Sequence, residues 1–228
     1  MNIIQKNIIN IKQKIISTAK KYNRLPEDIQ LIAVTKNKSC YDIQNAIYAG
    51  QYQFGENYVQ EGIKKILYFN KNQHNLKWHF IGTLQSNKTK LVAQYFDWCH
   101  TINKFEIAER LNKQRPSSKE PLNVLIQVNI TNEMNKSGIF PHTINKLINK
   151  ILLLEKLKLR GLMAIFSSNK TLIQQVSLFD TIEKIFQEIK NRYPSIDTLS
   201  IGMTNDFDIA IAFGSTLLRI GKAIFSNQ

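Results

Sequence analysis

Apolar positions along the chain follow two alternating periods. Residues 3–22 predict an amphipathic helix, because isoleucines recur there at helical spacing. Downstream, short apolar and β-branched runs alternate with segments of helical period, which is typical of parallel strands buried on both faces. The predicted strands cover residues 30–35, 52–57, 78–82, 98–102, 123–130, 157–165, 198–203 and 217–225.

A helix is expected after each of the first seven strands. Several ends are marked by capping or breaking residues: Ser39 suits an N-cap, Gly50 a C-terminal stop, and Pro116 and Pro194 end two further helices. The expected helices cover residues 40–49, 59–69, 84–96, 105–114, 141–155, 171–192 and 207–213.

Eight such strands in 228 residues indicate an α/β fold, a (β/α)₈ TIM barrel, with the extra N-terminal helix packed outside it or across its bottom. Because the eighth strand ends close to the C-terminus, we expect residues 1–228 to form this one domain, with no second domain. An open doubly wound sheet is the alternative. No GxGxxG motif follows the first strand, however, which disfavours a dinucleotide-binding fold.

The charge and cysteine content narrow the classes of function. A net charge of +14 would permit nucleic-acid binding, but the lysines are spread along the chain without a motif, so we disfavour that partner. No stretch is long and apolar enough to span a bilayer, and the N-terminus lacks a signal peptide's apolar centre. Cys40 and Cys99 have neither metal-type nor disulfide-type spacing, so we expect no metal site. Free thiols fit a reducing compartment, so we expect a cytoplasmic location.

The most unusual strand end is LIAVTK, where an apolar run stops on Lys36. A lysine in that position either extends into solvent or takes part in chemistry. Desolvation would lower the pKa of its amine and leave it nucleophilic, as Schiff-base formation with an aldehyde requires. Most lysines are solvated surface groups, so this stretch alone favours the first alternative.

Functional residues of such barrels gather at the carboxyl ends of the strands. SIGM and RIGK place glycine-containing turns after strands seven and eight, where barrels commonly bind phosphate through backbone N–H groups. Lys36 would lie across the barrel mouth from these turns, an arrangement that pyridoxal 5′-phosphate (PLP) requires. Arg219 lies two residues before Gly221, hence on the same face. There the guanidinium would meet the pyridine nitrogen. Because an arginine cannot give up its proton, that nitrogen would stay unprotonated.

Other residues at the strand ends have structural interpretations. His79 has no metal partner at suitable spacing, so we expect a core histidine. Asn57 suits a loop cap, and Glu56 has no paired carboxylate for general acid–base catalysis. Lys38 is expected to be a solvated neighbour of Lys36.

Six stretches together resemble the pyridoxal phosphate homeostasis protein family: LIAVTK, FGENYVQE, WHFIGTLQSNK, VNITNEMNKSG, GLMAI and LSIGMTNDFDIAIAFGSTLLRIGKAIF. The resemblance covers residues 30–226 and coincides with the predicted strand ends. It implies the barrel fold of the alanine racemase N-terminal domain, with PLP held as an internal aldimine on Lys36. The cofactor-binding residues expected from these motifs and positions are Lys36, Asn57, Ser200, Met203, Arg219, Gly221 and Lys222.

Within this set, the resemblance implies phosphate contacts from Ser200 and from the Gly221–Lys222 turn. The sequence departs from the family where Lys222 replaces a usual threonine, which keeps the backbone amide but loses the hydroxyl. It also departs at Thr83, where proline is usual, and at Ser226, where glycine is usual.

The resemblance implies a role in intracellular vitamin B6 homeostasis, in which PLP is held, buffered or handed on to PLP-dependent apo-enzymes. Racemases with this barrel need a second acid or base, supplied by an additional domain that the sequence does not offer. We therefore expect no efficient catalysis and assign no catalytic residue. The alternative is a weak PLP-dependent enzyme, such as an amino-acid racemase. Without a long exposed apolar stripe, a monomer is expected.

Overall fold

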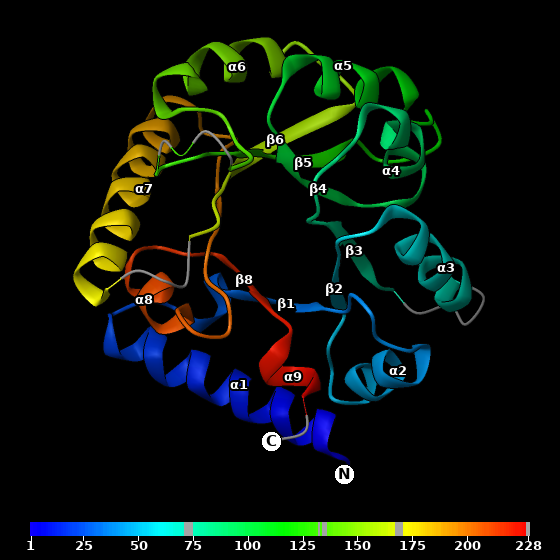
Figure 1. Ribbon diagram of the computed structural model, residues 1–228, viewed down its shortest axis with the longest axis vertical. Helices are drawn as coiled ribbons and strands as arrows, with labels where there is room; N and C mark the ends of the chain where they lie inside the picture. The colour runs from blue at the N-terminus through cyan, green and yellow to red at the C-terminus, as the bar shows by residue number, and fades with distance from the viewer. Residues whose placement is uncertain (71–74, 132, 134–135, 167–170, 227–228) are drawn as a thin grey trace.

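The computed structural model describes residues 1–70, 75–131, 133, 136–166 and 171–226. Within these residues, eight parallel strands close into a barrel in chain order, with β8 paired to β1 (Figure 1). The strands are β1 Gln30–Val34, β2 Gln53–Glu56, β3 Lys77–Phe80, β4 Trp98–Ile102, β5 Leu122–Gln127, β6 Leu157–Met163, β7 Thr198–Ser200 and β8 Leu217–Ile220. The predicted (β/α)₈ barrel is confirmed, and the open sheet is excluded.

Helices surround the barrel. They are α1 Ile3–Lys21, α2 Cys40–Tyr48, α3 Val59–Asn70, α4 Thr89–Tyr95, α5 Phe105–Gln114, α6 Ile144–Ile151, α7 Leu172–Arg192, α8 Phe207–Ala212 and α9 Lys222–Phe225, with short 3₁₀ turns η1 Pro26–Asp28, η2 Ser86–Lys88 and η3 Pro141–Thr143. The extra helix α1 starts in a capping box between Asn2 and Gln5, and it packs outside the barrel against α2, α8 and α9. No helix in the described ranges is long and apolar enough to cross a membrane.

The chain after the last strands differs from the prediction. Residues 217–225 were expected to be one strand, but the backbone turns at Gly221 and residues 222–225 form α9. The N–H groups of Ile224 and Phe225 donate to the Gly221 carbonyl, which closes this turn. The eighth strand is thus followed by a helix, as the other seven are.

Six further strands end one to three residues earlier than expected, and the largest difference at the end of a helix is four residues. β5 ends at Gln127, β6 at Met163 and β7 at Ser200, because the chain leaves the ladder for the loops at the barrel mouth. After β7, Gly202 has a φ of 94°, a conformation that glycine adopts without steric cost. The helix expected over residues 141–155 is instead η3 followed by α6, which ends at Ile151. It ends there because the chain turns, with the Leu154 N–H donating to the Ile151 carbonyl.

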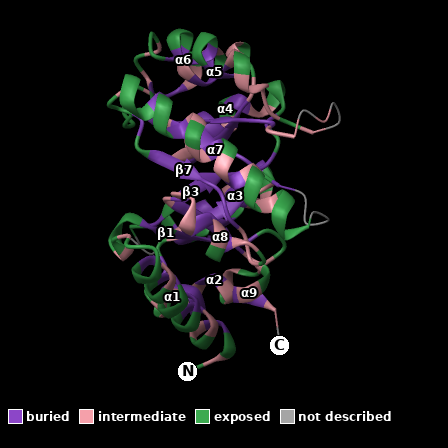
Figure 2. Cartoon of the chain, turned by 90° about the vertical axis from the view of Figure 1, so that its left-hand side faces the viewer, coloured by how far each residue is buried: buried purple, intermediate pink, exposed green. Residues whose placement is uncertain are grey.

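Buried side chains form two apolar clusters. The larger lies between the outer face of the barrel and the helices, and Figure 2 shows buried residues in the strands with exposed residues on the outer helix surfaces. The smaller fills the barrel interior with Ile32, Leu125, Met163 and Leu217. Polar side chains share that interior: His79, His100, Ser200 and Arg219 are all buried.

Candidate functional site

A cavity of about 370 Å³ opens at the carboxyl ends of strands β1, β2, β7 and β8. This volume falls within the range of small-molecule and cofactor sites. The apolar wall is formed by Val34, Ile81, Ile165 and Phe166, and Met203 and Gly221 also line the cavity. The polar lining consists of Lys36, Asn57, Gln175, Thr204, Asn205, Asp206, Arg219 and Lys222.

Six of the seven residues predicted to bind the cofactor line this one cavity; the exception is Ser200. Its side chain is fully buried, and its hydroxyl lies 2.7 Å from Arg219 Nη1 and 3.1 Å from His100 Nδ1. Ser200 therefore lies behind Arg219, a position that does not fit a direct contact with a ligand's phosphate. Thr204 and Asp206, which the sequence analysis missed, line the cavity from the loop after β7. The signal was present in SIGMTND, which carries a hydroxyl and a carboxylate just beyond the glycine turn.

Lys36 follows β1 after one intervening residue, Thr35, and is exposed. Its side chain is therefore accessible to solvent. Among the described residues, no carboxylate forms an ion pair with its amine. The next residue, Asn37, has a φ of 59° and turns the chain sharply, a conformation that asparagine tolerates better than most residues.

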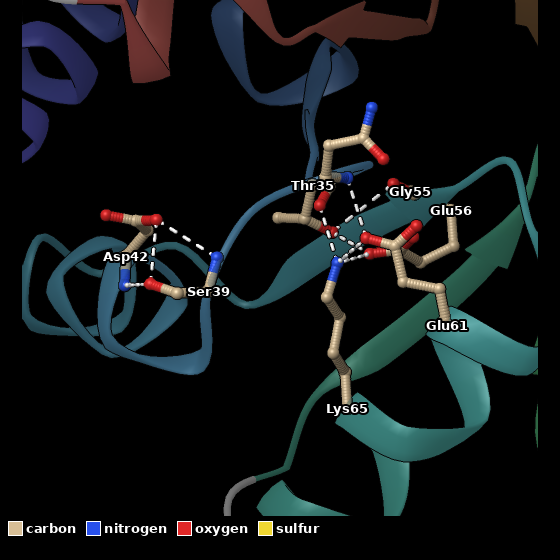
Figure 3. Close-up of polar contacts among 8 residues, drawn as sticks. Thr35, Ser39, Asp42, Gly55, Glu56, Glu61 and Lys65 are labelled. Atoms are coloured by element: carbon tan, nitrogen blue, oxygen red, sulfur yellow. Dashed lines mark hydrogen bonds and ion pairs between the residues drawn. The ribbon is translucent and has the colours of Figure 1, made fainter.

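A buried lysine holds the backbone on which Lys36 is mounted (Figure 3). Lys65 of α3 donates to the Thr35 carbonyl at 2.6 Å and to Glu56 Oε1 and Glu61 Oε1 at 2.7 Å each. The Thr35 hydroxyl donates to the same Glu56 oxygen at 2.5 Å. Burial raises the pKa of Glu56, and the hydrogen bonds from Lys65 and Thr35 oppose that rise.

The second glutamate of this cluster holds the other side of Lys36. Glu61 Oε1 also accepts the Asn37 N–H at 2.6 Å. The residues before and after Lys36 are therefore both fixed, while its side chain extends into solvent. The sequence analysis missed Lys65. The available signal was its position within the buried face of α3, between Gly62 and Ile66.

Arg219 projects from β8 and is held by three contacts with acceptors. Nη1 donates to the Ser200 carbonyl at 2.6 Å and to its hydroxyl at 2.7 Å, and Nη2 donates to the Ala164 carbonyl at 2.9 Å. Burial lowers the pKa of Arg219 to about 10, opposed by the charge of Asp206. The guanidinium therefore remains charged at neutral pH while its position is fixed.

Two buried histidines continue this network through the barrel interior. His79 Nδ1 lies 3.0 Å from His100 Nε2, and the His79 ring stacks on Trp98 with centroids 5.3 Å apart. Burial, assisted by the charge of Lys77, lowers the pKa of His79 to about 3. The pKa of His100 is also well below its usual value, mainly because of burial. Both rings are neutral at neutral pH. His79 was expected in the core; His100 was missed.

The part of the cavity wall beside β1 is built from the loop after β7 and the start of α9, because β8 pairs with β1. Lys36 therefore does not lie across the barrel mouth from these turns, as the sequence analysis expected. Helix geometry leaves the first N–H groups of α9 without intrahelical acceptors, and Gly221 and Lys222 occupy these positions. Thr204 Oγ1 accepts the Ala223 N–H at 3.4 Å, which joins the loop to the helix. Asp206 accepts the Met203 N–H at 2.6 Å, and burial raises the pKa of this carboxyl.

Asn57 supplies the remaining distinctive group. Its Oδ1 atom is buried and has no hydrogen-bond partner within the described part of the chain. Buried polar atoms are rarely left unpaired, because an unmade hydrogen bond loses the stabilisation that water would supply. An acceptor of this kind, at the wall of a cavity, fits a ligand that carries a hydroxyl or N–H donor.

Comparisons with known proteins identify the class of this fold. The family model described as "Alanine racemase, N-terminal domain" matches residues 10–228. An alanine racemase of Clostridium difficile superposes with a TM-score of 0.68 at 16% identity, covering 95% of this chain and 56% of that one. PipY of Synechococcus elongatus, solved with PLP bound, gives a TM-score of 0.81 at 32% identity, covering 93% of this chain and 100% of that one. The barrel is thus of the alanine racemase N-terminal class.

Curated relatives narrow the class to one family. The pyridoxal phosphate homeostasis protein of Escherichia coli is 50% identical over 229 residues, covering 100% of this chain and 98% of that protein. The one from Haemophilus influenzae is 50% identical over 227 residues, covering 99% of this chain and 96% of that protein. The chain belongs to the pyridoxal phosphate homeostasis protein family, as the six motifs predicted.

Proposed function

We propose that this protein holds PLP on the Lys36 amine and acts in intracellular PLP homeostasis. The observation that carries the proposal is that Lys36, Asn57 and Arg219 line the same cavity, where Asn57 Oδ1 has no hydrogen-bond partner among the described residues. The names of the relatives and the PLP in the PipY structure support it. PLP supplies an aldehyde that condenses reversibly with a primary amine.

Lys36 and its surroundings suit reversible attachment. The amine is exposed, whereas the Thr35 carbonyl is clamped by Lys65 and the Asn37 N–H by Glu61. A fixed backbone with a solvent-exposed side chain lets the amine reach an aldehyde without displacement of the strand end.

Two residues fit the ring of the cofactor. Asn57 Oδ1 is an acceptor without a partner among the described residues, so it suits a hydroxyl substituent. Arg219 has only donors and stays charged, so a ring nitrogen that accepts from it remains unprotonated. An unprotonated ring withdraws electrons weakly, which favours holding the cofactor over amino-acid chemistry.

The phosphate fits best at the start of α9. The proposed donors are the N–H groups of Gly221 and Lys222, the Thr204 hydroxyl and the Lys222 ammonium, all at the cavity wall. Thr204 takes the hydroxyl role that the sequence assigned to Ser200, because the Ser200 hydroxyl is already bonded inside the barrel.

We propose that the protein is a cofactor holder without efficient catalysis, working as a monomer in the cytoplasm and supplying PLP-dependent apo-enzymes. The alternative, a weak PLP-dependent enzyme, draws support from Asp206, a carboxyl at the cavity wall whose pKa burial raises. Turnover of several amino acids separates the two. Rates above those of free PLP that fall in Asp206→Asn would favour the enzyme, and rates equal to free PLP would favour the holder.

The attachment is tested by absorption spectroscopy, borohydride reduction and peptide mapping of protein supplied with PLP. Wild-type protein should show a bound-cofactor band that reduction fixes to the peptide containing Lys36. Lys36→Ala should lose the band, whereas Lys64→Ala, which removes an exposed lysine of α3, should retain it. A reduced label on Lys222, or one spread over several lysines, would contradict the proposal.

A further inference from the structure

A chain of hydrogen bonds crosses the barrel interior from the cavity side. Arg219 Nη1 lies 2.7 Å from the Ser200 hydroxyl, which lies 3.1 Å from His100 Nδ1. His100 Nε2 is 3.0 Å from His79 Nδ1, and His79 Nε2 is 3.1 Å from Gln53 Oε1. The first four side chains are all buried, and Arg219, the most accessible of them, is 4% exposed.

Every hydrogen bond of this chain is satisfied when the protons are donated in the direction from Arg219 towards Gln53. Arg219 has only donors, so the Ser200 oxygen accepts from it and the Ser200 hydrogen goes to His100 Nδ1. His100 then carries its proton on Nε2 and donates to His79 Nδ1. His79 likewise carries its proton on Nε2 and donates to Gln53 Oε1. Both rings are neutral in this arrangement, because a doubly protonated ring would place a donor against a donor.

The far end of the chain is also fixed. Gln53 Nε2 donates to Gln30 Oε1 at 2.8 Å, so the Gln53 oxygen faces His79. Gln30 and Gln53 are the first residues of β1 and β2, whereas Arg219 lines the cavity at the opposite ends of the strands. The chain therefore spans the barrel and ties the guanidinium to the rigid sheet at its other end.

We propose that Ser200, His100 and His79 are positioning residues that fix the Arg219 guanidinium toward the ring nitrogen of bound PLP. The proposal rests on the proposed function, which assigns Arg219 to that nitrogen. Rotation of any one side chain would put two donors or two acceptors face to face in the barrel interior, where an unmade hydrogen bond is costly. The guanidinium therefore keeps one orientation.

Proton positions test the directional chain without any cofactor. Nitrogen NMR of the histidine rings at neutral pH should show His79 and His100 protonated at Nε2 and unprotonated at Nδ1. The variants His79→Gln and His100→Gln assign the two signals, and His142→Gln assigns an exposed histidine of η3. A proton on His100 Nδ1 in the wild-type protein would overturn the proposal.

Cofactor spectra test the positioning. His100→Phe keeps a ring but removes both nitrogens, and Ser200→Ala cuts the chain next to the guanidinium. Each should bind PLP about ten-fold more weakly and shift the bound-cofactor band or its pH midpoint. His79→Phe acts one link further away and should shift the band less. The exposed His142→Gln is the control and should leave band and affinity unchanged.

Two negative outcomes remain distinguishable. If these variants only melt at lower temperature while the band keeps its position and pH midpoint, the residues serve packing alone and the positioning role is refuted. If wild-type protein forms no link to Lys36 after reduction, the proposed function fails, and with it the assignment of Arg219 to a ring nitrogen. The ring-proton measurement on the unliganded protein is unaffected by that second result.

Discussion

The neutral histidine pair makes stability depend on pH in a calculable way. His79 and His100 are fully buried, and the pKa of His79 is about 3 while that of His100 is well below its usual value. In the unfolded chain each ring titrates near 6.5. Below that pH the unfolded state binds more protons than the folded state, so stability present above about pH 6.5 is lost as the pH falls.

The size of the effect follows from proton linkage. Between about pH 7.5 and about pH 5.0, protonation of one free histidine favours the unfolded state by about 2 kcal/mol, provided that the folded ring stays neutral. Two such rings give about 4 kcal/mol. The pKa values of Glu56 and Asp206 are raised, so these carboxyls contribute stability at low pH that is lost as the pH rises. Their effect therefore opposes that of the histidines.

Comparison with a matched variant cancels the contribution of Glu56 and Asp206, because both proteins keep these two carboxyls. The double variant His79→Gln/His100→Gln keeps a donor and an acceptor at each position but does not titrate there. Urea unfolding followed by tryptophan fluorescence, at several pH values between these limits, gives the free energy of unfolding of both proteins. The wild type should lose about 4 kcal/mol more than the variant on acidification. A difference below about 1 kcal/mol would mean that the folded rings accept protons, which would refute the neutral assignment.

Three further changes test the surroundings of the site. Lys65→Met leaves the buried Glu56 carboxylate without its ion pair and removes the contact with the partly exposed Glu61, so it should lower the free energy of unfolding by about 3–5 kcal/mol in urea titrations. Lys64→Met on the exposed side of α3 should change it by about 0.5 kcal/mol or less. Gly82→Ala would place a Cβ 2.0 Å from the Asn57 carbonyl oxygen. Titration with PLP should therefore show weaker binding, and the free energy of unfolding should fall by about 1–3 kcal/mol. Unchanged binding would refute the placement of Asn57. Thr204→Val should weaken PLP binding about ten-fold by fluorescence titration, and wild-type affinity would exclude its hydroxyl from the phosphate site.

The barrel was predictable because it depends on local pattern: apolar strands alternating with helices define a parallel closed sheet. The strand end alone favoured a solvated Lys36, and it was the resemblance of the six motifs to a known family that singled this lysine out. The boundary between β8 and α9 was not predictable in the same way. Residues 222–225 read as a continuation of an apolar strand, and only the turn at Gly221 against Val34 converts them into a helix.

The missed residues depend on contacts between distant parts of the chain. Lys65 holds a carbonyl 30 residues away, and His100 contacts a hydroxyl 100 residues away, so neither partner is visible in a local window. The sequence analysis placed Ser200 on the correct strand, as a phosphate contact that the resemblance implies. Its depth in the barrel, behind the side chain of Arg219, is set by the stagger of the closed sheet and cannot be obtained from alternation along one strand.

Two of the cations that line the cavity, Lys36 and Arg219, are mounted in opposite ways, and the difference matches reversible cofactor holding. At Lys36 the backbone on both sides is clamped, while the side chain is exposed and unpaired among the described residues. At Arg219 the side chain itself is fixed by three acceptor contacts and by the histidine chain behind it. Attachment and release require an amine that moves, whereas control of the ring nitrogen requires a donor that does not. If both side chains were fixed, the site would bind the cofactor without releasing it. If both were mobile, the site would not define the electronic state of the cofactor ring.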